Sequence, residues 1–102
     1  MTFIREAAMA GQFYPGAAAE LDATVRNFLD AADTGHDPVP KAIIAPHAGY
    51  DYSGAIAAHA YARLAPAAET ITRVVLLGPC HRVPVRGFAL PAAQSFATPL
   101  GE

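Results

Sequence analysis

The sequence predicts an α/β fold that contains a parallel or mixed sheet. Two short runs of apolar residues, 41–45 and 72–77, read as strands, and each ends at a proline- or glycine-marked turn. A helix-like stretch, 54–64, lies between them. This order predicts a strand–helix–strand unit, and the crossover in such a unit is right-handed almost without exception when the strands are parallel.

Two amphipathic or small-residue segments predict the helices. Residues 17–32 place Leu21, Val25, Phe28 and Leu29 on a single stripe at i, i+4, i+7 and i+8 spacing. Residues 1–16 before this segment are rich in turn-forming residues and read as irregular. The second helix is expected over 54–64, with Ser53 as its N-cap.

The expected strands have the character of strands buried on both faces. Residues 41–45 show no polar alternation, and 72–77 are β-branched and apolar. A third strand is expected at 85–90, weakened by Gly87. Two helices are too few to cover both faces of a parallel sheet. We therefore expect residues 1–102 to form the N-terminal portion of a single larger α/β domain, whose C-terminal part is absent.

Composition narrows the classes of function. The chain has 102 residues, 53% hydrophobic and 16% charged, with a net charge of −2. Its seven Lys and Arg residues are scattered, which argues against a nucleic-acid partner or a membrane surface. The N-terminus lacks the pattern of a signal peptide, and the single cysteine gives no hint of an oxidising compartment. These features predict a cytoplasmic protein.

Two histidines directly follow the two main expected strands. His47 comes after 41–45 and His81 after 72–77, so both are expected at the carboxyl edge of the sheet, where open α/β sheets bind ligands. Imidazole is the commonest metal-binding side chain. The placement predicts a divalent-metal site. The alternative is that one or both histidines cap the strand ends by hydrogen bonding to the backbone. The nearest carboxylate in sequence is Asp51, which reaches the site only if its loop folds back.

Other residues near the histidines have two readings each. Cys80 precedes His81, and neighbours on an extended backbone point to opposite sides, so a Cys–His dyad is not expected. Cys80 is expected to be a small buried residue near the site. The alternative is that its thiolate is the third ligand of the metal. Four aromatic residues either line a pocket or pack the core and loops: Phe13, Tyr14, Tyr50 and Tyr52. His59 is read as a structural helix residue and His36 as a solvated one.

Several motifs in this order resemble the Memo family, whose prokaryotic members are called AmmeMemoRadiSam system protein B. They are AGQFYP at 10–15, APHAGYDYSG at 45–54, AHAY at 58–61, LGPCHR at 77–82 and SFATPLGE at 95–102. The resemblance extends from about Arg5 to Glu102.

The resemblance implies a fold similar to class III extradiol dioxygenases, which carry non-haem iron. It implies a site made of two histidines and a cysteine. The histidines correspond to His47 and His81, whereas the cysteine belongs to the C-terminal part, so the third ligand is not expected in this chain. Cys80 stands where the family usually has serine.

The resemblance further implies iron, or alternatively copper, and a metal-dependent, dioxygenase-like redox activity in the complete form. Because the site is incomplete here, the isolated chain is expected to be inactive. Because two helices cannot cover its expected strands, it is also expected to be prone to self-association. The alternative is a metal-free binding module that holds an anionic peptide or small molecule in a His-lined cleft. Animal members of the family are also linked to phosphotyrosine segments of receptors, a role that transfers poorly to a prokaryotic-looking chain rich in Ala and Pro.

Overall fold

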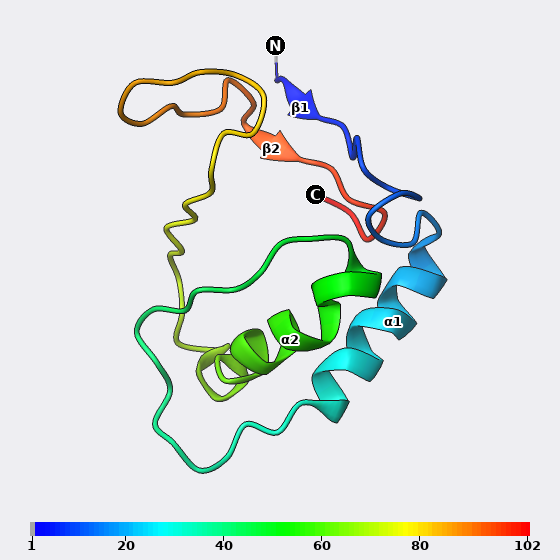
Figure 1. Ribbon diagram of the computed structural model, residues 1–102, viewed down its shortest axis with the longest axis vertical. Coiled ribbons are helices and arrows are strands. Elements are labelled where there is room, and N and C mark those ends of the chain that lie inside the picture. The colour runs from blue at the N-terminus through cyan, green and yellow to red at the C-terminus, as the bar shows by residue number, and fades with distance from the viewer. Residues whose placement is uncertain (1) are drawn as a thin grey trace.

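Two packed helices and one short parallel ladder make up the regular structure of residues 2–102, which the computed structural model describes (Figure 1). In chain order the elements are β1 (Ile4–Arg5), α1 (Ala18–Ala31), α2 (Tyr50–Ala62), the 3₁₀ turn η1 (Ala65–Ala67) and β2 (Ser95–Phe96). The combination of helices with a parallel sheet confirms the predicted α/β class.

Helix α1 confirms the helix predicted over 17–32. Leu21 is buried, and Val25 and Phe28 are half-buried, so the predicted stripe is the face that packs. Leu29, at the far end of the stripe, is 37% exposed. On the solvent side, Arg26 Nε donates to Asp22 Oδ2 at 2.8 Å, one turn away.

Helix α2 begins at Tyr50, four residues before the predicted start. The prediction that Ser53 is the N-cap is wrong, because Gly49 holds that position and Ser53 lies inside the first turn. The Ser53 hydroxyl instead donates to the Ala48 carbonyl at 3.0 Å. The Tyr50 N–H, which has no partner within the helix, donates to the Phe13 carbonyl at 2.7 Å. A tertiary contact thus satisfies the helix start in place of a side-chain cap.

The two helices approach closely at Gly54. A Cβ atom added there would lie 2.7 Å from Phe28 Cε2 on α1, well inside van der Waals contact. Ala58 and Ala62 continue the same buried face of α2. Small residues on α2 therefore receive the larger side chains of α1.

A short clasp joins the two ends of the described chain. Strands β1 and β2 run parallel, with Ile4 opposite Ser95 and Arg5 opposite Phe96. The Gln94 N–H donates to the Phe3 carbonyl at 2.9 Å, and the Arg5 guanidinium lies 5.2 Å from the centroid of the Phe96 ring. Sequence patterning predicted neither strand, because two-residue strands carry no readable alternation.

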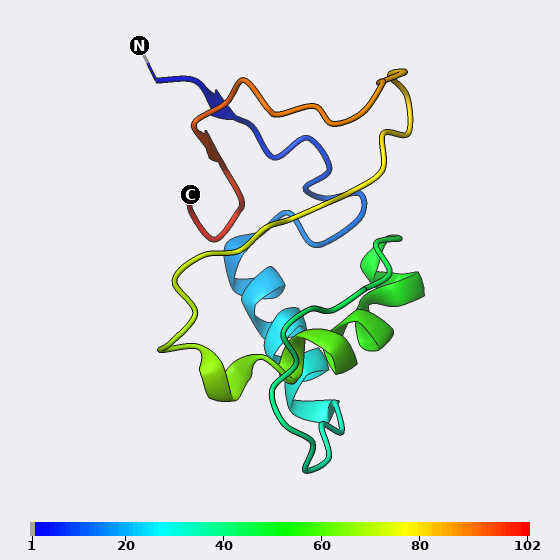
Figure 2. The same cartoon turned by 90° about the vertical axis from the view of Figure 1, so that its left-hand side faces the viewer.

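The strands predicted at 41–45, 72–77 and 85–90 are not strands in this structure. Within the described part of the chain, residues 72–93 make no backbone hydrogen bond to one another or to another segment. Figure 2 shows residues 72–77 crossing one side of the molecule as a lone extended stretch. The residue types favour strands, but a strand exists only when a neighbour pairs with its backbone.

The architecture is open. The accessible surface is 8691 Å², whereas a folded chain of 10.6 kDa exposes about 5,500 Å². The radius of gyration is 15.1 Å, against about 12.8 Å for a compact domain of this length. The buried apolar residues described are Leu21, Ala58 and Ala62. Neither helix in residues 2–102 has the length and apolar character needed to cross a bilayer.

Candidate functional site

The structure brings His47 and His81 into contact, although they are 34 residues apart. Their Nε2 atoms lie 3.1 Å apart, and their ring centroids are 5.2 Å apart with the planes inclined at 55°. Both residues are exposed. Because 41–45 and 72–77 run without hydrogen-bonded neighbours, this contact is made at the ends of two unpaired stretches.

The spacing of the two Nε2 atoms has two chemical readings. In one, the Nε2–H of one neutral imidazole donates to the lone pair of the other, since 3.1 Å is a hydrogen-bond distance. In the other, both lone pairs face a common cation. With metal–nitrogen bonds of about 2.1 Å, a separation of 3.1 Å subtends about 95° at the metal, whereas a tetrahedral angle would need about 3.4 Å. The pair therefore fits two adjacent positions of an octahedral or square-planar centre.

A third ligand is not found beside this pair. Within residues 2–102, no three His, Cys, Asp or Glu side chains gather in the way that a metal requires. Asp51 lies exposed in the first turn of α2. Cys80 is a free, exposed thiol, so the prediction that it is buried is wrong, because its whole segment lacks a covering layer.

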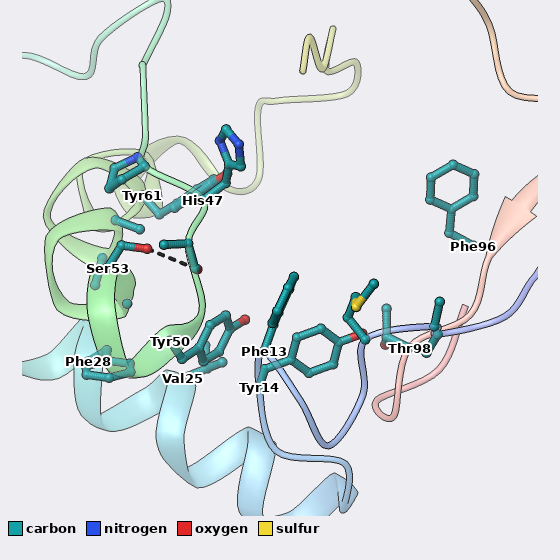
Figure 3. Close-up of a pocket in the computed structure, with 18 of the residues that line it drawn as sticks. Phe13, Tyr14, Val25, Phe28, His47, Tyr50, Ser53, Tyr61, Phe96 and Thr98 are labelled. Carbon is teal, nitrogen blue, oxygen red and sulfur yellow. Dashed lines mark hydrogen bonds between the residues drawn. The ribbon is translucent and has the colours of Figure 1, made fainter. Parts of the chain in front are cut away.

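A cavity of about 740 Å³ opens beside His47, between the helix pair and the β1–β2 clasp (Figure 3). Three of the predicted pocket residues, Phe13, Tyr14 and Tyr50, line it. Tyr52 and Cys80 are not among its lining residues, and Tyr52 is 88% exposed. Sequence reasoning missed several other lining residues: Arg5, Met9, Val25, Phe28, Tyr61 and Phe96. Helical periodicity had indicated Val25 and Phe28 as core residues but not as a cavity wall.

Tyr50 occupies the inner part of this wall. Its ring centroid lies 5.7 Å from that of Tyr14 and 6.3 Å from that of Phe28, the latter edge-on. Burial, and then the neighbouring Tyr14 and Tyr61, raise the pKa of the Tyr50 hydroxyl above its ordinary value of 10.0. The hydroxyl is therefore neutral at physiological pH and presents a hydrogen-bonding group to a largely apolar cavity.

The remaining two histidines, His36 and His59, do not line this cavity. His59 Nδ1 is 3.4 Å from the Asp33 carbonyl oxygen, which agrees with its structural reading. Arg63, the C-cap of α2, donates from Nη2 to the Pro38 carbonyl at 3.3 Å. His36 is exposed in the loop between Asp33 and Pro38, which the hydrogen bonds of His59 and Arg63 hold against α2.

Comparison with known proteins extends over nearly the whole chain. A family model described as Memo-like protein matches residues 5–102. Protein MEMO1 of Danio rerio is 45% identical over 96 residues, which cover 94% of this chain and 31% of that protein. Protein MEMO1 of Homo sapiens is 41% identical over the same shares, and the protein memo-1 homolog of Caenorhabditis elegans is 37% identical over 96% of this chain and 27% of its own length. The chain thus spans about a third of the length of these relatives.

Proposed function

Because the chain belongs to the Memo family, we propose that it contributes His47 and His81 to a divalent redox-metal site. Iron is the expected metal and copper the alternative. The observation that carries the proposal is the 3.1 Å approach of the two Nε2 atoms, which fits adjacent positions of an octahedral or square-planar centre.

The donor set suits such a metal but is incomplete. Neutral imidazole is a good ligand for iron and copper, and the exposure of both rings leaves room for further ligands. The remaining protein ligands must come from outside the described residues, since no third donor gathers there. A bound iron or copper ion would supply one-electron chemistry. We therefore also propose that the complete protein has a metal-dependent redox activity.

This chain's own residues position the ligands. His47 stands two residues before the Gly49 N-cap, and the Ser53 hydroxyl holds the intervening Ala48 carbonyl at 3.0 Å. The backbone that follows His47 is thereby tied to the start of α2. His81 has no such support and follows the unpaired 72–77 segment. We expect metal binding to order His81 more than His47.

Calorimetric titration with anaerobic Fe²⁺ and with Cu²⁺ tests the proposal. Weak binding by the wild-type chain should disappear in His47→Ala and in His81→Ala. The matched control is His36→Ala, which removes an exposed histidine elsewhere. Equal binding in all four proteins would reject the site.

The cavity favours a second candidate function, a metal-free binding module for an anionic peptide or small molecule. Its volume of about 740 Å³ is typical of ligand pockets, and Arg5 and His47 are polar groups at a mostly apolar wall. The anionic aromatic dye 8-anilinonaphthalene-1-sulfonate is a suitable probe. Binding that is lost in Arg5→Gln and His47→Ala but is unaffected by chelator would favour this module over the metal site. A cytoplasmic location is part of either proposal and is tested by cell fractionation.

A further inference from the structure

The His47–His81 pair supplies half of the ligands that one plane of a metal centre needs. Both imidazoles are exposed, and their Nε2 atoms lie 3.1 Å apart. A square-planar or octahedral centre takes four ligands in one plane, of which this pair provides two neighbouring ones. In the part of the chain that the structure describes, no third His, Cys, Asp or Glu side chain joins them. The other two positions of the plane are therefore open to a second molecule.

Two copies of the pair complete such a plane by symmetry. A two-fold axis through the metal relates one pair to the other, as in the commonest class of homodimer. Each pair spans about 95° at the metal, which leaves about 85° between the two pairs, and an ideal square plane needs about 90°. Four neutral imidazoles from two identical chains thus fit one metal without a change in the spacing of either pair.

The surface around the histidines is open to a second copy. Residues 71–90, which include His81, are all exposed. Three large apolar side chains within four positions of the histidines are exposed by 67–99%: Ile44, Leu77 and Val83. The accessible surface exceeds that of a compact chain of this mass by about 3,200 Å², whereas one partner in a standard interface contributes about 800 Å². A two-fold contact centred on the metal therefore has enough apolar surface to cover.

We propose that a second copy of this chain completes the metal site, so that His47 and His81 of both copies hold one divalent metal on a two-fold axis. The inference rests on the proposed function, because it takes these two histidines as ligands. Cys80 is exposed and belongs to no metal-holding group with them, so it has no part in this site. Since one chain offers two ligands, its affinity for the metal is weak alone and rises with chain concentration as the dimer forms.

Cu²⁺ is the suitable probe, because it prefers four nitrogen ligands in a plane. Every protein in the experiment carries Cys80→Ser, since Cu²⁺ oxidises exposed thiols and a disulfide would imitate the dimer. Every protein also carries Val75→Lys, at a side chain that is 80% exposed, to suppress association that does not depend on metal. Titration and sedimentation are performed at chain concentrations on the order of tens of micromolar, where a dimer of modest affinity forms.

We expect calorimetry to saturate at one Cu²⁺ per two chains and the sedimenting mass to double, with EDTA restoring the monomer. The electron paramagnetic resonance spectrum of the bound Cu²⁺ should show coupling to four equatorial nitrogens. His47→Ala and His81→Ala should each lose the dimer and the four-nitrogen signal. The matched control His36→Ala, which removes an exposed histidine elsewhere, should keep both.

The possible failures separate this inference from the proposed function. One Cu²⁺ per chain, bound through His47 and His81 without dimerisation, would overturn the second copy and leave the proposed function standing. A dimer that persists in EDTA would also overturn the inference, because the metal would not be what holds it. Binding that is strong in the unsubstituted chain but lost with Cys80→Ser would assign a missing ligand to Cys80 instead. Cu²⁺ binding that is unchanged in both histidine variants would reject the inference and the metal site together.

Discussion

Replacing Val75 by lysine should weaken self-association of the 102-residue chain. Val75 is 80% exposed, so the substitution removes no contact that the isolated chain needs. When chains associate through their bare 72–77 stretches, Val75 becomes buried. Burial of a valine side chain is worth about 1.5–3 kcal/mol, and a buried lysine adds a desolvation cost. We therefore expect each association step to weaken by about 10- to 100-fold.

Sedimentation velocity at several concentrations measures this effect. The wild-type chain should sediment as a broad, concentration-dependent distribution of oligomers and bind an apolar dye. Val75→Lys should shift the distribution toward monomer, and Val83→Lys should leave it where it is, because that residue lies outside the stretch. A wild-type chain that is monomeric, melts cooperatively and exposes no dye-accessible surface would refute the reasoning. The open surface would then be closed by a rearrangement of the chain itself.

Three further predictions concern the site and the helix pair. The 102-residue chain should bind Fe²⁺ and Cu²⁺ with dissociation constants above about 1 μM. A metal site normally needs three or four protein ligands, and no third donor gathers beside the two histidines within residues 2–102. Stoichiometric binding with a sub-micromolar dissociation constant in calorimetry would contradict this. Gly54→Ala should destabilise the helix pair by about 1 kcal/mol, because overpacking against the Phe28 ring costs about 2 kcal/mol and the gain in helix propensity is about 1 kcal/mol. Thermal melting followed by circular dichroism at 222 nm measures this change. The control Gly78→Ala, where an added Cβ meets open space, should be neutral. Tyr50, whose pKa is raised in the folded state, stabilises the fold fully below pH 10.0 and loses that contribution as the pH rises through its folded pKa. Tyr50→Phe should therefore reduce alkaline destabilisation in melts between pH 9 and 12, whereas Tyr52→Phe, at an exposed ring, should not.

Sequence reasoning succeeded where local pattern and tertiary packing agree. The stripe at Leu21, Val25 and Phe28 gave helix α1 because its spacing matches the helical period and α2 covers that face. The encounter of His47 with His81 was also anticipated, from their equivalent positions after two apolar runs. The count of predicted helices indicated that two could not cover both faces of the expected strands, and residues 74–77 are exposed in the structure.

Sequence reasoning failed where structure depends on partners distant in the chain. The start of α2 was misplaced because the Phe13 carbonyl, 37 positions earlier than Tyr50, receives the helix N–H that a side-chain cap would otherwise satisfy. The β1–β2 ladder was missed because each strand has two residues and no periodicity. Conversely, 41–45 and 72–77 have strand composition, but composition cannot supply the neighbouring backbone that completes a ladder.

The clasp between β1 and β2 has a consequence for the order in which the chain folds. It closes a loop of about 90 residues, since the Phe3 N–H bonds to the Gln94 side chain across 91 positions. Closing such a loop costs about 4 kcal/mol of chain entropy, and the two-residue ladder returns only a few hydrogen bonds. The helices, whose contacts are far more local, must therefore form before the clasp. Substitutions in β1 or β2 should accelerate unfolding while leaving the folding rate nearly unchanged.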